Sequence, residues 1–182
     1  FEAGKSVTTG THNTLIGGLA GDALTTGSSN VAVGYGALTT DDVGQWNVAI
    51  GRDALSAQNI ASAANTYNTA VGGAAGAAIT TGTHNTLIGG LAGDALTDAD
   101  ENVAVGYAAL TSDTLGSRSV AIGREALTTQ NFTSATTAYN TAVGANAGQA
   151  VTTGIDNTLI GGLAGDALTV GNSNVAVGTH AL

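Results

Sequence analysis

The chain has 182 residues, a mass of 17.5 kDa and a formal net charge of −9, with 28 glycines, few aromatic residues and no proline, cysteine or methionine. The missing cysteine excludes a disulfide framework and any thiolate nucleophile or metal ligand. No apolar run reaches the roughly 20 residues of a membrane helix, and four lysines and arginines make a nucleic-acid phosphate surface a poor interpretation.

A pentapeptide repeat begins after residues 1–12, which match the end of an earlier copy. It reads Asn, Val or Thr, Ala or Leu, Val or Ile, Gly. We call each copy a rung and number its positions from the Asn. The ten rungs begin at Asn13, Asn30, Asn47, Asn68, Asn85, Asn102, Ser119, Asn140, Asn157 and Asn174.

The spacing of the rungs has a second period. Most rungs have the length of the first, 13–29, but those beginning at Asn47 and Ser119 are four residues longer. Four rungs, one of them long, make a unit that then recurs: 13–84 and 85–156 are complete units, and 157–182 begin a third. We treat 1–182 as one β-solenoid segment. Because the chain starts and stops within rungs and lacks an initiator Met, we expect it to be a piece of a longer fibrous protein.

The rung length predicts the fold class. Seventeen residues are too few for a helical hairpin repeat, which needs about 33 to 47. The pentapeptide instead alternates with the period of two that is typical of a β-strand. We therefore predict an all-β, parallel β-solenoid of about ten rungs, standing about 50 Å tall.

The two faces of the strand carry different side chains. Positions 2 and 4 hold Val, Thr or Ile, and we expect these β-branched residues to face the core. Position 3 would then face outward as a stripe of Ala with a periodic Leu. We interpret this stripe as a contact face between chains, marked by Leu15, Leu87 and Leu159. The alternative is that the stripe forms the other wall of the core.

The second half of a rung has two forms. One has Gly at position 9 and an aliphatic residue at position 12, as at Gly21 and Leu24. The other has Leu at position 9 and a polar residue at position 12, as at Leu38 and Asp41. Each form provides one large aliphatic side chain, so we expect a narrow core that is marginal for a single chain.

The long rungs carry their extra residues in 47–67 and 119–139, where insertions in a solenoid form loops on one face. Their aromatic residues are candidates for a ligand-facing loop: Tyr67, Phe132 and Tyr139. Packing of these rings onto the tube is the competing interpretation.

Position 1 is Asn in nine of the ten rungs. Stacked asparagine side chains can hydrogen-bond from coil to coil, as they do in cross-β stacks. We predict a structural ladder of Asn13, Asn30, Asn47, Asn68, Asn85, Asn102, Asn140, Asn157 and Asn174.

The pentapeptides at 30–34, 47–51 and 68–72 and their later copies resemble the head repeats of trimeric autotransporter adhesins (YadA-like) and similar repeats of phage tail fibres. The resemblance covers essentially the whole chain. It implies a left-handed parallel β-roll, a homotrimer of chains side by side, and an extracellular, cell-surface or virion fibre that adheres to a surface or matrix ligand. The chain departs from those head repeats in two ways: its rungs are longer, and it has a four-rung unit.

No motif in the repeat indicates catalysis or a cofactor. Lys5 follows a Gly as in a phosphate-binding loop, but its copies at 77 and 149 are Ala and Gln. His12 and His84 are replaced by Asp156 in the third unit, which does not suit a metal or catalytic site. Asp22 and its copies recur too rarely for a calcium cage. We predict a protein that is not an enzyme, without metal or cofactor.

The functional prediction is a structural or adhesive fibre segment that associates with itself, does not bind nucleic acid and does not insert into a membrane. The alternative is an ice-binding solenoid that uses Thr pairs in its turns. The pairs at 25–26, 80–81 and 152–153 share a register, whereas those at 39–40 and 128–129 do not.

Overall fold

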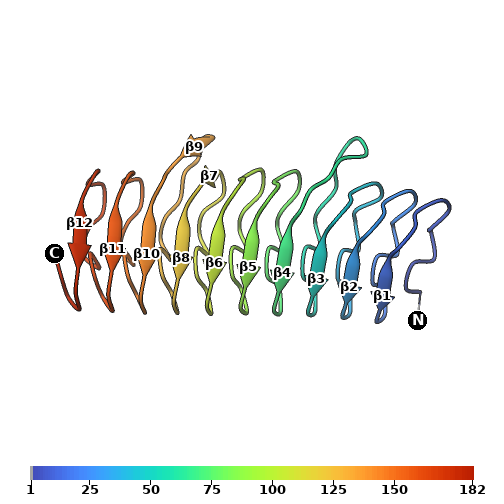
Figure 1. Ribbon diagram of the computed structural model, residues 1–182, viewed down its shortest axis with the longest axis horizontal. Helices are drawn as coiled ribbons and strands as arrows, with labels where there is room; N and C mark the ends of the chain where they lie inside the picture. Colours follow the sequence, from blue (N-terminus) through green and yellow to red (C-terminus); the bar gives the residue numbers. More distant parts are fainter. Residues whose placement is uncertain (1) are drawn as a thin grey trace.

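The computed structural model describes residues 2–182 and consists of strands and turns without a helix. The fold is a parallel β-solenoid of about ten turns (Figure 1), which confirms the predicted fold class. Ten strands form one sheet, one strand per rung: β1 Thr14–Ile16, β2 Val31–Val33, β3 Val48–Ile50, β4 Thr69–Val71, β5 Thr86–Ile88, β6 Val103–Val105, β8 Val120–Ile122, β10 Thr141–Val143, β11 Thr158–Ile160 and β12 Val175–Val177.

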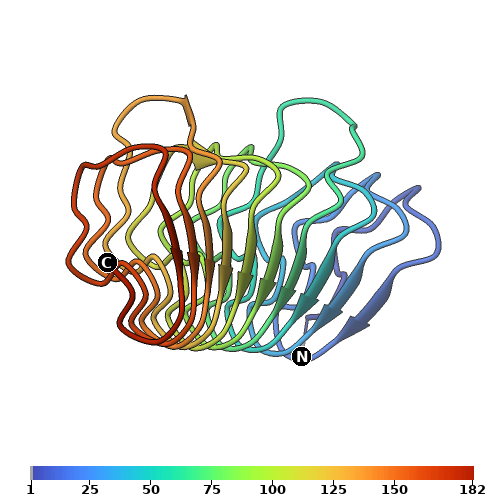
Figure 2. The ribbon, with the colours of Figure 1, turned by 60° about the vertical axis from the view of Figure 1, so that its left-hand side comes forward.

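Neighbouring strands pair in parallel and in the register of the repeat. Thr14 pairs with Val31, and Thr86 pairs with Val103, each at the same position one rung further on. The register is kept across the first long rung, where Val48 pairs with Thr69. The extra residues leave the tube as loops, which project beyond the neighbouring turns in Figures 1 and 2.

The two loops return to the tube in the same way, one unit apart. A single parallel bridge joins Gln45 to Asn65 in the first unit. In the second unit the equivalent residues extend to a two-stranded pair, β7 Gly116–Ser117 with β9 Thr136–Thr137. The recurrence of this pairing one unit later agrees with the predicted four-rung period.

The core is the reverse of the one that the alternation predicted. Position 3 points inward, and Ala32, Leu87 and Leu159 have no exposed surface. Positions 2 and 4 face solvent; Ile88 at position 4 is 40% exposed. The tube is so narrow that the strand can contribute only a small residue or an occasional Leu, since the opposite wall already supplies a large aliphatic side chain.

That opposite wall uses both predicted forms, each of them in two neighbouring rungs before the other follows. Leu24 and Leu96 at position 12 are fully buried, as are Leu38 and Leu110 at position 9. The alanine of position 8 is buried in every rung from Ala20 to Ala164. The interior is filled by alanines and one large aliphatic side chain per rung, with a second in the rungs that have Leu at position 3.

The glycine of position 5 is required by the stacking of the rungs. In Gly89 the backbone φ is +136°, a region that side chains with a Cβ rarely adopt. A Cβ on Gly89 would lie 2.4 Å from the carbonyl oxygen of Gly106, the equivalent glycine one rung on. Both the dihedral angle and the distance to the next rung therefore exclude other residues.

Candidate functional site

The asparagines of position 1 form a hydrogen-bonded ladder along the tube, interrupted at Ser119. The Oδ1 atom of Asn85 accepts from the backbone N–H of Asn102, at 2.9 Å. Its Nδ2 donates to the carbonyl of Ala99, near the end of the same rung, at 2.8 Å. One side chain thus ties adjacent rungs together and holds the last turn of its own rung.

Most members of the predicted ladder repeat these contacts. The Oδ1 atom accepts from the backbone N–H of position 1 in the next rung, at 2.8–3.1 Å, in Asn13, Asn30, Asn47, Asn68, Asn85, Asn102, Asn140 and Asn157. Asn174 in the last rung donates to Asn157 and Asn172 instead. The contact is mainly side chain to backbone rather than the amide-to-amide stacking of cross-β ladders.

The ladder changes at the long rungs. Among the described residues, the Nδ2 of Asn47 is the one buried side-chain polar atom without a hydrogen-bond partner. In the shorter rungs this Nδ2 donates to a carbonyl 14 residues further on. In the rung that begins at Asn47, that position lies within the inserted loop. The equivalent position one unit later is Ser119, which has no second donor, and its Oγ accepts from Gln130.

A buried Asp–Gln pair underlies each long rung, formed by residues that the sequence identified only as polar members of position 12. Gln58 Nε2 donates to Asp41 Oδ2 at 2.6 Å, and the backbone N–H of Gly44 donates to Asp41 Oδ1. Gln130 and Asp113 repeat the pair. Burial raises the pKa of the Asp41 carboxyl, against the hydrogen bonds that favour its charged form.

The predicted chain–chain face at Leu15, Leu87 and Leu159 is wrong. Leu87 and Leu159 lie fully inside the tube, and Leu15 packs against the same core. The alternative interpretation, in which the stripe is a wall of the core, is the one that the structure shows. Leu87 and Leu159 therefore cannot contact a second chain.

The predicted ligand-facing loop is only partly at the surface. Tyr67 and Tyr139 are about half exposed, at 45% and 54%. Phe132 is only 6% exposed, because its ring lies against Gly116 at the base of the loop. Phe132 therefore belongs to the packing of the loop, and its assignment to a ligand-facing surface is wrong.

Tyr67 and Tyr139 belong to a longer row that the sequence analysis missed. The residue before position 1 of each rung has a left-handed φ of 50–63°. We call this row the flank ladder: His12, Ser29, Trp46, Tyr67, His84, Glu101, Arg118, Tyr139, Asp156 and Ser173. A fixed offset of one residue from the repeated asparagine was the signal that could have revealed it.

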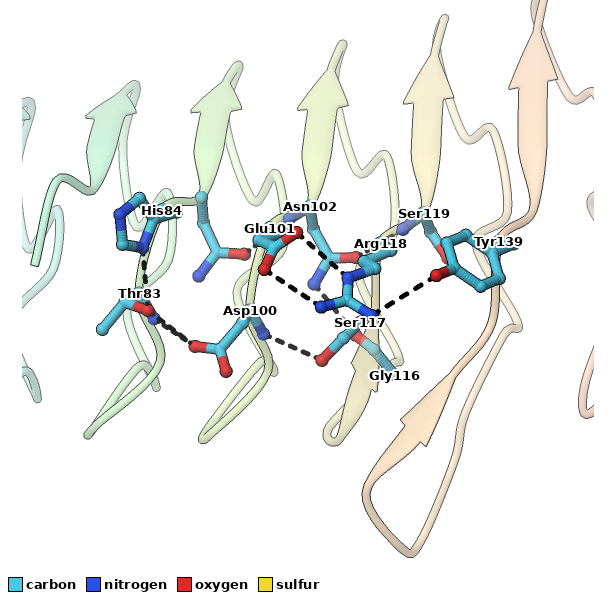
Figure 3. A network of polar contacts seen from close by, with 11 residues as sticks. Thr83, His84, Asp100, Glu101, Asn102, Gly116, Ser117, Arg118, Ser119 and Tyr139 are labelled. Atoms are coloured by element: carbon cyan, nitrogen blue, oxygen red, sulfur yellow. Dashed lines mark hydrogen bonds and ion pairs between the residues drawn. The ribbon is translucent and has the colours of Figure 1, made fainter.

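Side chains in the flank ladder contact one another along the tube. Trp46 and Tyr67 stack with ring centroids 6.3 Å apart, and Tyr67 meets His84 at 5.3 Å. Further along, Arg118 pairs with Glu101 at 3.0 Å and lies 5.9 Å from the ring centre of Tyr139 (Figure 3). The hydrogen bond from Arg118 holds the pKa of Glu101 below its ordinary value.

The second exposed feature is the outer surface of the ten-stranded sheet. We call positions 2 and 4 of all rungs the outer face; they carry only Val, Thr and Ile, without a charged residue. At position 4, Ile16, Ile50, Ile88, Ile122 and Ile160 are 37–59% exposed. An exposed, uncharged apolar surface of this kind commonly marks an interaction site.

The described residues 2–182 contain no enclosed pocket and no cluster of acidic or histidine side chains suited to hold a metal ion. No helix in this part of the chain could cross a bilayer. Comparisons with protein-family models, curated proteins and solved structures find no match for the chain.

Proposed function

We propose that the chain is a structural and adhesive segment of a secreted, cell-surface or virion fibre, and that three copies associate side by side. The observation that carries this proposal is the outer face. Its two rows of β-branched side chains run along ten stacked strands, and nothing in the described part of the chain covers them. The resemblance of the pentapeptides to adhesin and tail-fibre repeats supports the same function.

Association would be driven by burial of apolar surface. Removing apolar area from water contributes about 25 cal/mol per Å², and the outer face exposes such area in every rung. Its regular spacing of about 4.8 Å between strands offers a second copy a surface of matching period. This face replaces the leucine stripe as the proposed contact between chains.

Light scattering on the purified chain tests the association. The expected mass is three times the 17.5 kDa of one chain. Ile88→Lys combined with Ile122→Lys places two charges in the middle of the outer face and should yield monomers with an unchanged circular dichroism spectrum. Thr26→Lys, an exposed turn position away from the face, is the matched control. A wild-type monomer at micromolar concentration contradicts the proposal.

The ice-binding alternative receives less support. In the pairs at 8–9, 25–26 and 152–153, the first hydroxyl donates to a backbone carbonyl of the next rung. One hydroxyl of each of these pairs therefore has a partner within the chain. A thermal-hysteresis measurement separates the two functions, because a fibre segment should leave the freezing point of the solution unchanged.

A further inference from the structure

The single tryptophan of the chain presents one uncovered ring face. Trp46 is 52% exposed, and Tyr67 stacks on the side nearer the C-terminal rungs with planes 24° apart. On the other side the next member of the flank ladder is Ser29, whose side chain is too short to cover an indole. Within residues 2–182 no other ring stacks on Trp46.

No other ring of the flank ladder lies next to that face of Trp46 within the described residues. The next ring along the flank ladder belongs to His12, two rungs away, which is about 9.6 Å. Ser29 lies between the two rings. The site is an open shelf on the surface, since the described residues enclose no pocket there.

The hydrogen-bonding group next to Trp46 along the flank ladder is uncharged. The backbone N–H of Ser29 donates to the carbonyl of Thr11 at 2.9 Å, and its hydroxyl makes no hydrogen bond to any described residue. That hydroxyl can donate and accept. Ser29 and Trp46 carry no charge, and within the described part of the chain His12 forms no ion pair.

The second unit provides an internal comparison. Its equivalent positions are His84, Glu101 and Arg118, where Glu101 and Arg118 pair with each other. A charged side chain therefore replaces Ser29, and no indole is present. The shelf belongs to the first unit alone.

We infer that Trp46 and Ser29 form a binding site for a neutral pyranose ring of a glycan. A pyranose has an apolar C–H face that packs on an indole, and hydroxyl groups at its edge that need uncharged partners. An apolar side chain of a protein partner is a poorer fit, because the flank-ladder residues on this side of Trp46 are the polar Ser29 and His12. The net charge of −9 disfavours acidic sugars. The inference rests on the proposed adhesive function and assigns it a ligand class.

Tryptophan fluorescence tests the inference directly, because Trp46 is the only tryptophan. The probes are the methyl glycosides of glucose, galactose, mannose and N-acetylglucosamine. At least one should change the emission saturably. Ser29→Glu, which copies Glu101 with its φ of 59°, should weaken that binding at least tenfold while keeping Trp46. Tyr107→Ala, another exposed aromatic outside the flank ladder, should bind as the wild type does.

Two results would overturn the inference: no saturable response to any of the four glycosides, or equal binding by wild type and Ser29→Glu. A response to an added protein but to no sugar counts against it in the same way. The mass of each sample, recorded by light scattering, shows separately whether the proposed self-association fails.

Discussion

At the scale of the residue, asparagine is required at position 1 because its Oδ1 and Nδ2 atoms each make a hydrogen bond that the stacking of the rungs uses. Its carbonyl oxygen accepts from the next rung and its amide donates within its own rung, as in Asn85. A serine side chain is too short to reach either the carbonyl near the end of its rung or the backbone N–H of the next rung. The repeat therefore accepts serine only where the long rung has already removed that carbonyl, at Ser119.

This difference predicts unequal costs for the same substitution. Asn85→Ser leaves the carbonyl of Ala99 and the N–H of Asn102 without partners in a buried site, which costs about 1–3 kcal/mol. Asn47→Ser loses only acceptor contacts, since the Nδ2 of Asn47 has no partner among the described residues. Thermal unfolding should show a lower Tm for Asn85→Ser than for Asn47→Ser. Equal Tm values would show that the amide donor contributes nothing.

The buried Asp41 predicts a dependence of stability on pH. Its pKa in the folded chain is raised above the ordinary 3.8, so the folded state binds a proton more readily than the unfolded state. The contribution of Asp41 to the free energy of unfolding therefore increases as the pH falls through the folded pKa towards 3.8.

Thermal unfolding of the wild type and Asp41→Asn between pH 7 and pH 3.5 measures that contribution. The difference in Tm, wild type minus variant, should become more positive as the pH is lowered. A difference that stays constant or becomes more negative would contradict the assignment.

At the scale of the element, each rung is a short strand followed by turns that require left-handed backbone. The glycine of position 5 is the strictest case. Gly89→Ala should lower the free energy of unfolding by about 3 kcal/mol or more, because the new Cβ meets the carbonyl of Gly106 at an unfavourable φ.

The neighbouring Gly73 is the matched control. Its φ is not in the left-handed region, and a Cβ there would meet nothing within 4 Å. Gly73→Ala should change the free energy of unfolding by no more than about 0.5 kcal/mol, as for ordinary surface positions. Similar losses for both variants in urea unfolding would show that stacking does not select glycine.

Sequence periodicity predicted the strands, their parallel order, the two turn forms and the looped long rungs. It did not predict which face of the strand is inside, because alternation alone separates two faces without labelling them. β-Branched residues suit any pleated surface, exposed or buried. The narrow interior decided the matter in favour of Ala32 and its equivalents.

The flank ladder also lay outside the prediction. Its residue types change from rung to rung, from Trp46 to Glu101, so no identity repeats. What repeats is a backbone conformation, which the sequence does not display for residues other than glycine. The contacts among these side chains depend on that shared conformation.

At the scale of the whole molecule, the tube is more compact than its thin core suggested. Its accessible surface is 7338 Å², whereas a compact monomer of 17.5 kDa exposes about 7900 Å². Alanine and glycine let the rungs approach closely enough to compensate for few large side chains. Self-association is therefore inferred from the composition of the outer face and not from a deficit of buried area.

The position of the contact between copies can be measured by thiol labelling, since the chain has no cysteine. Val105→Cys places a thiol in the middle of the outer face, and Thr26→Cys places one on an exposed turn. If copies meet through the outer face, Cys at 105 should react with a maleimide much more slowly than Cys at 26. Its rate should recover when Ile88→Lys and Ile122→Lys are added. Equal rates for the two thiols in the otherwise wild-type chain would contradict the account.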